Sequence, residues 1–437
     1  MTTDSPTSVH IVFALDRHHP DFEKLAKATQ HIGHISILSR DDKWKAVCDA
    51  HNWSFFTLEG TYKSKLNKRR WGIFRLIAGY LEHRRYREVA NTRLAQLTPD
   101  LLILAKDHKD VFYYLAQYAN CPTMLPQLTL YSEADLTVGY DVVSPSNNPF
   151  IRSWQQRLFK TVNNQLLKYR ENIWLTLGKY LAGYRQKYIS KGGNVDAFAV
   201  NGKAFTAMYL RLGLPNDTIR NVGGVEHDEL YALRSVHAPH PIKQPPVIVF
   251  FLPPLFGGEP SQSAVAELKT LLKTITSKHN CTLQFKPHPL DVKKGALASI
   301  DALCPNECCT VLKTDGYTRT QDLASIIASS DLVVHSASSV VFTAAALQKP
   351  SVVYVSRVSP YFSSRYKEHY ETYATYADDV TSFLDVLEHF FSNTSEFVEQ
   401  CREKANNYAE DYMVLDGKVM QRYVNLCQSL LSKQKSA

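Results

Sequence analysis

Residues 331–354, DLVVHSASSVVFTAAALQKPSVVY, carry the pattern from which the fold follows. The apolar, β-branched run at 331–335 predicts a buried strand, and the small polar turn after it leads into a predicted helix at 339–348. PSVVYVS then predicts a second strand. A strand, a helix and a strand in this order are the repeating unit of a parallel sheet covered by helices on both faces.

The same alternation extends in both directions. Upstream of this stretch, VIVFFLPPL and TLQFKPH predict two more strands, and VHIVFAL, HISILS, DLLILA and DAFAVNG predict strands in the first half. The proline-rich segment SVHAPHPIKQPP at 235–246 lacks periodicity and predicts a linker. The chain is therefore expected to form an α/β protein with two Rossmann-like doubly wound domains facing a cleft, at 1–235 and 247–437, with a linker at 236–246 and C-terminal helices.

The composition narrows the class of protein. The length of 437 residues suits two domains, and the formal charge of +8 suits anionic ligands but not a dedicated nucleic-acid binder. The eight cysteines have neither zinc-site spacing nor the density of a disulfide scaffold. With no basic leader and no run of about 18 apolar residues, we expect a cytoplasmic, soluble protein that needs no metal and no cofactor.

Two groups of polar residues follow predicted strands of the second domain. Lys286 and His288 follow the strand of TLQFKPHP between prolines that stiffen the backbone, and Ser336, Ser338 and Ser339 occupy the turn before the helix of residues 339–348. Because parallel strands end at one edge of a sheet, these groups are expected to surround one anion, such as a nucleotide's diphosphate. The alternatives are a surface turn and ordinary helix capping.

Gly257 and Gly258, in the loop LPPLFGGEPSQS, would let the backbone approach such a ligand closely, although an ordinary loop explains them equally. The spacing is neither a G-x-G-x-x-G fingerprint nor a P-loop, which argues against NAD and ATP.

A displacement reaction also needs a general base in the first domain. Asp16 follows VHIVFAL, and Asp107 with His108 follows DLLILAK, so each is a candidate, with a surface carboxylate or turn cap as the alternative. Residues 226–228, Glu-His-Asp, are a third possibility.

The pairing of KPHP with SASSVVFTAAALQKPSVV resembles the HP and SS motifs of GT-B fold transferases of bacterial surface polysaccharides. That group includes sialyl- and polysialyltransferases, capsule Kdo transferases and CDP-glycerol glycerophosphotransferases. The resemblance implies that His288, Ser338 and Ser339 hold the phosphate of a nucleotide-activated donor. Thr343 stands where many nucleotide-sugar enzymes of this fold have a ribose-binding glutamate, which favours a CMP- or CDP-linked donor over UDP-sugar.

Residues 63–87, KSKLNKRRWGIFRLIAGYLEHRRYR, contain ten Lys, Arg or His residues with interspersed aromatic residues. This pattern suits contact with an anionic membrane or polysaccharide, and it also suits a solvated helix with its aromatic residues in the core. The sequence thus predicts a glycosyltransferase with donor pocket at 240–375 and glycan or glycolipid acceptor on 1–235. The alternatives are a hydrolysing UDP-sugar 2-epimerase and a non-catalytic polyanion-binding protein.

Overall fold

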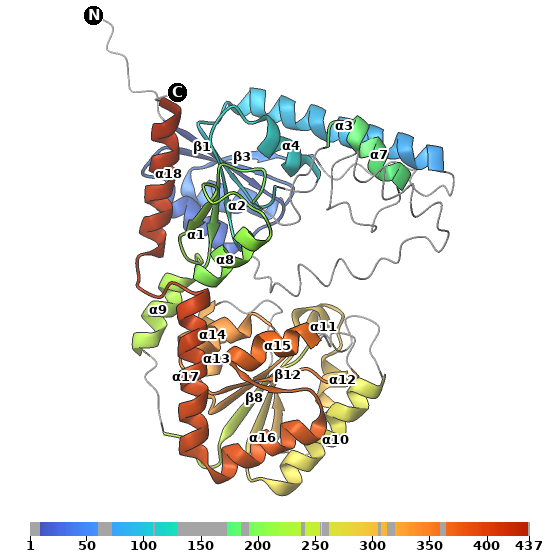
Figure 1. Cartoon of the computed structure of the whole chain (residues 1–437), viewed down its shortest axis with the longest axis vertical. Helices are drawn as coiled ribbons and strands as arrows, with labels where there is room; N and C mark the ends of the chain where they lie inside the picture. Colours follow the sequence, from blue (N-terminus) through green and yellow to red (C-terminus); the bar gives the residue numbers. More distant parts are fainter. Residues whose placement is uncertain are drawn as a thin grey trace, which may run out of the picture. The chain divides into compact units, whose positions relative to one another are not determined.

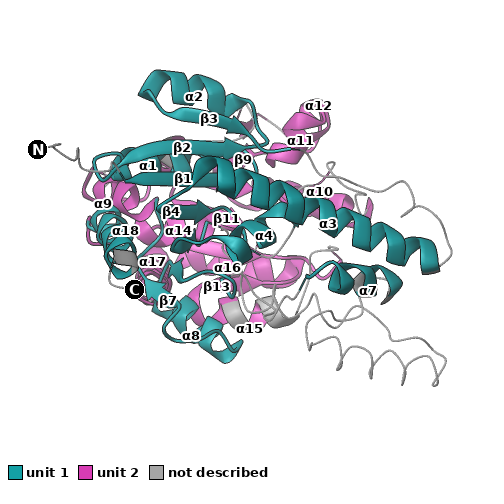
Figure 2. Ribbon diagram, turned by 90° about the horizontal axis from the view of Figure 1, so that it is seen from above, with its two compact units in different colours: residues 1–225, 418–437 teal, residues 226–417 magenta. Residues whose placement is uncertain are grey.

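The computed structural model describes residues 9–59, 72–107, 110–128, 173–184, 192–236, 241–253, 255, 262–304, 307–312, 320–336, 338–358 and 364–435. The chain divides into two compact units, unit 1 of residues 1–225 and 418–437 and unit 2 of residues 226–417 (Figure 2). Each unit contains one parallel sheet flanked by helices (Figure 1), so the predicted pair of doubly wound α/β units is confirmed.

The described part of unit 1 has seven parallel strands in the order β3-β2-β1-β4-β5-β6-β7. Their bounds are β1 His10–Leu15, β2 His34–Ser39, β3 Ser54–Thr57, β4 Leu101–Leu104, β5 Thr123–Pro126, β6 Ala197–Val200 and β7 Ile219–Asn221. The helices are α1 Pro20–Thr29, α2 Lys43–His51, α3 Gly72–Leu97, α4 Asp110–Tyr118, α7 Ile173–Leu181, α8 Lys203–Arg211 and α18 Val419–Lys435. The chain reverses direction across the sheet between β1 and β4.

The described part of unit 2 has six parallel strands in the order β10-β9-β8-β11-β12-β13. Their bounds are β8 Val247–Phe251, β9 Thr282–Lys286, β10 Cys309–Val311, β11 Leu332–His335, β12 Ser351–Tyr354 and β13 Thr375–Ala377. The helices are α9 His227–Val236, α10 Gln262–Lys278, α11 Pro289–Lys293, α12 Leu297–Asp301, α13 Thr320–Ser329, α14 Val340–Ala346, α15 Ser364–Tyr373, α16 Val380–Ser392 and α17 Thr394–Tyr412. Here the reversal lies between β8 and β11.

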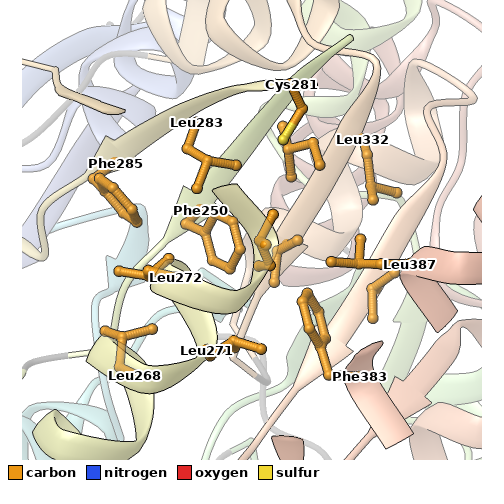
Figure 3. Close-up of a cluster of buried hydrophobic side chains, with 14 of the residues drawn as sticks. Phe250, Leu268, Leu271, Leu272, Cys281, Leu283, Phe285, Leu332, Phe383 and Leu387 are labelled. Atoms are coloured by element: carbon orange, nitrogen blue, oxygen red, sulfur yellow. The ribbon is translucent and has the colours of Figure 1, made fainter. Parts of the chain in front are cut away.

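Helical periodicity explains how unit 2 builds its core. In α10 the buried residues Leu268, Leu271, Leu272 and Ile275 recur at three- and four-residue intervals, which forms one apolar stripe. This stripe packs with the sheet and α16 in a cluster that includes Phe383 (Figure 3). A second cluster joins the opposite face of the sheet to α13 and α14. The sheet is therefore covered on both sides, as its uninterrupted apolar strands require.

The division of the chain differs from the expected boundaries at two places. Helix α9, residues 227–236, packs on α13 and α14 and so belongs to unit 2. Helix α18 returns to unit 1, where it packs on α1 and β4. Helix α18 has an apolar stripe that includes the buried Val419, Tyr423 and Cys427. Such a stripe predicts from the sequence that one face of the helix is buried, but it does not predict which of the two sheets covers that face.

No described helix is long and apolar enough to cross a membrane. Within the same described ranges, no group of three or more His, Cys, Asp or Glu residues is arranged to hold a metal ion.

Candidate functional site

The strand order of unit 2 places the two predicted motifs at one edge of the sheet. Strand β8 lies between β9, which ends at Lys286, and β11, which ends at His335. In parallel sheets of this kind, ligands bind beyond the carboxyl ends of the strands where the chain reverses direction. Lys286 is thus the last residue of β9 and His288 lies two residues beyond it, while Ser336, Ser338 and Ser339 follow β11, with one strand between the two groups.

Within the described part of the chain, Lys286 is a buried cation without a counter-charge. Its side chain is only 5% exposed, and Nζ donates a single hydrogen bond, 3.3 Å long, to the carbonyl of Pro287. No carboxylate among the described residues forms an ion pair with Lys286, and burial lowers the pKa of its ammonium group. An unpaired buried charge destabilises the folded state, so this lysine is the kind of residue that a bound anion would compensate.

His288 combines a structural contact with a free donor position. It is the N-cap of α11, where its Nδ1 accepts a hydrogen bond of 3.2 Å from the backbone N–H of Leu290. Burial lowers the pKa of His288, as does nearby Lys286, whereas Asp291 raises it. Because Nδ1 accepts, the proton of the neutral ring resides on Nε2. The neutral histidine can therefore cap α11 and donate from Nε2 to a ligand oxygen at the same time.

The motif is tied to the loop after β8 by a second buried contact. Asp291, in the first turn of α11, is fully buried and accepts a 3.0 Å hydrogen bond from the backbone N–H of Leu255. The glycines Gly257 and Gly258, two and three residues farther along this loop, lie outside the described residues, so their predicted contact with a ligand stays a prediction.

The serine turn does not perform the capping role that was its alternative explanation. Ser339 is the N-cap residue of α14, but its side chain makes no capping hydrogen bond. The hydroxyl of Ser338 is buried and has no hydrogen-bond partner in the described ranges. Ser336 is half-buried, and Thr343 is buried in α14. The hydroxyls of Ser338 and Ser339 are thus unused within the described structure, as expected of groups kept for a ligand.

Sequence inspection missed His335, the last residue of β11. It is in register with Phe251, which is in register with Lys286 on the other side. Residues in register on parallel strands project to the same face, so Lys286 and His335 flank Phe251 roughly 10 Å apart. His335 is buried, neither ring nitrogen has a hydrogen-bond partner among the residues that the structure describes, and burial lowers its pKa to about 3. The only signal in sequence is a polar residue that ends an apolar strand.

In unit 1 the structure separates the candidate bases. Asp16 is half-buried at the end of β1, and it pairs with Arg40 at 3.2 Å and with Lys106 at 3.0 Å. Asp107 is completely buried, and its Oδ2 accepts hydrogen bonds of 3.0 Å from the backbone N–H groups of Gly192 and Asn194. These contacts make Asp107 an anchor for that loop, which accounts for its burial without a catalytic role. His108 lies outside the described residues.

In the third candidate group, residues 226–228, the contacts of His227 give this histidine a structural role. His227 is fully buried, its Nδ1 accepts a hydrogen bond of 3.1 Å from the backbone N–H of Val414, and burial lowers its pKa to about 4. The contact joins α9 to the segment after α17 within unit 2.

The basic segment predicted at 63–87 is described from residue 72 onward, as the first part of α3. Tyr86, one of the aromatic residues of this segment, is buried, as expected for a helix with its aromatic residues in the core, and its hydroxyl donates to Glu82 at 3.3 Å. The exposed apolar residues are instead Ile73, Ile77 and Leu81, which recur every four residues along one stripe of α3.

Helix α7 packs closely against α3 (Figure 2). A Cβ atom on Gly79 would lie 2.5 Å from the carbonyl oxygen of Leu175, so the absence of a side chain permits close backbone contact. Trp174 and Leu181 of α7 are also exposed. The two helices thus carry five of the large exposed apolar side chains of the described chain.

Comparison with solved structures gives the fold. A glycosyltransferase from Rickettsia africae ESF-5 matches with a TM-score of 0.53 and 9% identity over 98% of this chain and 99% of that one. The wall teichoic acid polymerase TagF matches with a TM-score of 0.52 and 10% identity over 99% of this chain and 91% of that one. UDP-GlcNAc 2-epimerase from Neisseria meningitidis, bound to UDP-GlcNAc, matches with a TM-score of 0.53 and 10% identity over 97% of this chain and 100% of that one.

The chain has the GT-B fold. This similarity spans both units and includes transferases and an epimerase, so at such low identity it leaves the reaction open. No protein-family model matches the sequence, and no curated protein has a significantly similar sequence.

Proposed function

We propose that the chain is a glycosyltransferase that binds a nucleotide-activated sugar on unit 2 and a glycan or glycolipid acceptor on unit 1. The observation that carries the proposal is Lys286, a buried cation with no counter-charge among the described residues, at the sheet edge where nucleotides bind in this class of fold. The unused hydroxyl of Ser338 and the Nε2 position of His288 add hydrogen-bond donors that follow strands of the same edge.

In the proposed reaction, a hydroxyl oxygen of the acceptor attacks the anomeric carbon of the donor sugar. The bond from that carbon to the phosphate oxygen breaks, and its electron pair leaves with the nucleotide. Lys286, His288 and the serine hydroxyls stabilise the negative charge that accumulates on the phosphates. Asp16, which is half-buried at the end of β1, is the candidate that accepts the proton from the acceptor hydroxyl.

His288 gives the sharpest test of this assignment, because its two nitrogens have different roles. In His288→Asn the amide oxygen can still cap α11, since Asn is a good N-cap residue, but the donor at Nε2 is lost. We expect both His288→Asn and His288→Ala to lower turnover by orders of magnitude, with the melting temperature preserved in His288→Asn. Full activity in either variant would refute the role.

The donor is best sought with a thermal-shift screen of CMP, CDP, UDP and GDP on the full chain. Thr343, at the place of the ribose-binding glutamate of many related enzymes, leads us to expect the largest stabilisation from a cytidine nucleotide. The pathway that we propose is the synthesis of a surface polysaccharide or lipooligosaccharide at the cytoplasmic face of the membrane.

The epimerase among the structural neighbours keeps an isomerase as the second candidate. Incubation with a nucleotide sugar and no acceptor distinguishes the two reactions, because an epimerase changes the sugar unaided. A non-catalytic polyanion-binding protein would instead bind glycan with strong salt dependence and release no nucleotide from any donor.

A glycolipid acceptor would bring the protein to the membrane, and we propose that the exposed apolar stripe of α3, formed by Ile73, Ile77 and Leu81, makes this contact. Exposed apolar side chains suit a lipid surface. The exposed Arg84 and Arg85, one helical turn from Leu81, pair with Glu88 at 2.9 Å and with Glu59 at 2.7 Å, and they would exchange these surface ion pairs for lipid phosphates. Ile77→Asp should abolish sedimentation with phosphatidylglycerol vesicles. Leu210→Asp is the matched control, because Leu210 in α8 is equally exposed, and equal loss in both variants would exclude a specific surface.

A further inference from the structure

Three neighbouring strands of unit 1 bring four charged residues together. Asp16 follows β1, Arg40 follows β2 and Lys106 lies two residues after β4, while Asp110 begins α4. Arg40 Nη1 lies 3.2 Å from Asp16 and 3.6 Å from Asp110, and Lys106 Nζ lies 3.0 Å from Asp16 and 3.6 Å from Asp110. Each cation thus contacts both carboxylates, at the point where the chain reverses direction across the sheet.

The cluster is layered, with its cations inside and its carboxylates outside. The side chains of Arg40 and Lys106 are 12% and 17% exposed, and both cations lie over the ring of the buried Phe112, at 5.4 and 4.9 Å from its centroid. The side chains of Asp16 and Asp110 are 40% and 30% exposed. A ligand that approaches from solvent therefore meets carboxylate oxygens before it meets either cation.

The formal charges of the cluster cancel, and the cations hold both carboxylates in fixed positions. Asp110 Oδ2 lies within 3.6 Å of both cations, while Asp16 contacts Arg40 through Oδ1 and Lys106 through Oδ2. Because the two carboxylates share both cations, they are close enough to contact one sugar ring together. Ionised carboxylates accept hydrogen bonds and donate none. Hydroxyl groups are the complementary partners, whereas a ligand carboxylate or phosphate would be repelled by the outer layer. Asp110 also has a left-handed backbone, with φ of 53°, which Asp tolerates better than most residues.

We propose that this cluster is a sugar-binding site for the acceptor, and that it selects an uncharged, hydroxyl-bearing sugar over an acidic one. The inference rests on the proposed function, and it specifies the acceptor class. Asp110 binds one hydroxyl of the sugar, and Asp16 contacts the neighbouring hydroxyl that attacks the donor. Arg40 and Lys106 are positioning residues, since they act through the carboxylates. Of the four residues, sequence inspection selected only Asp16.

Saturation-transfer NMR on the full chain tests the proposal with the methyl glycosides of glucose, galactose and N-acetylglucosamine against glucuronic acid and sialic acid. We expect signals from one or more of the neutral sugars and none from the acids. Asp110→Asn should weaken the neutral-sugar signal at least tenfold while it retains the left-handed backbone, because Asn tolerates that conformation. Asp49→Asn, an exposed carboxylate on α2, is the control and should bind like the unmodified protein.

Preferential binding of the acids, wild-type binding by Asp110→Asn, or no binding of any sugar would each overturn the proposal. A thermal-shift measurement with nucleotides on the same samples distinguishes failure of the acceptor-site proposal from failure of the proposed function. A protein that is stabilised by a nucleotide but binds no neutral sugar loses the acceptor site only. A protein that no nucleotide stabilises, but whose sugar signal still requires Asp110, retains this site and loses the transferase.

Discussion

Replacement of Lys286 by Met removes the buried charge but keeps the length of an unbranched side chain. In the unliganded protein, burial of a polar group without compensation costs about 1–3 kcal/mol, and more when the group is charged. Lys286 has one hydrogen bond of 3.3 Å as compensation. We therefore expect Lys286→Met to be more stable than the unmodified protein by about 1–3 kcal/mol, which corresponds to roughly 2–12 °C in melting temperature for a unit of this size.

The same substitution should weaken nucleotide binding. A hydrogen bond to a charged group contributes about 1.5–3 kcal/mol, so its loss should raise the dissociation constant roughly 10- to 150-fold. Calorimetric titration of the full chain with the nucleotide that gives the largest thermal shift measures this change. Lys273→Met, which alters an exposed lysine on α10, should change neither the stability nor the affinity.

The pH dependence of stability gives an independent check. Burial lowers the pKa of Lys286 below its ordinary 10.5. Between the lowered pKa and 10.5, the unfolded chain binds more protons than the folded chain, so the unfolding free energy rises as the pH rises through this window. Lys286→Met should lack this increment. A variant that is less stable and binds nucleotide like the unmodified protein would refute the idea of an uncompensated cation kept for a ligand.

Three further substitutions test neighbouring parts of the structure. Ser338→Ala should leave the melting temperature unchanged or higher, because the hydroxyl has no partner, and should weaken nucleotide binding about tenfold in the same titration. His335→Leu should be more stable than the unmodified protein by about 1–3 kcal/mol at pH 7. Because burial lowers the pKa of His335 to about 3, the unmodified protein loses stability as the pH falls below 6.5. Urea titrations at several pH values should show a smaller loss of stability in the variant. Asp107→Ala should lower stability by about 1–3 kcal/mol because two backbone N–H groups lose their acceptor, with the nucleotide affinity unchanged; a nucleotide-binding defect there would contradict its role as a loop anchor.

Local patterns determined the fold class and the donor-side candidates. Apolar strands that alternate with amphipathic helices specify a helix-covered parallel sheet, because only this arrangement buries both strand faces. Polar residues after a strand must then lie at the carboxyl edge, so Lys286, His288 and the serine turn were identifiable without coordinates. That inference needs the order of elements along the chain and no knowledge of distant contacts.

Tertiary structure decided what depends on contacts between distant residues. The apolar stripe of α18 fits either sheet, and only packing assigns it to unit 1. Asp16 and Asp107 both follow a strand, yet their surroundings differ. Asp107 is buried against the backbone N–H groups of residues 192 and 194, whereas Asp16 is held by ion pairs with Arg40 and Lys106. His335 stands out only because its nitrogens have no partner, and the absence of a partner is a property of the surroundings that no local sequence pattern encodes.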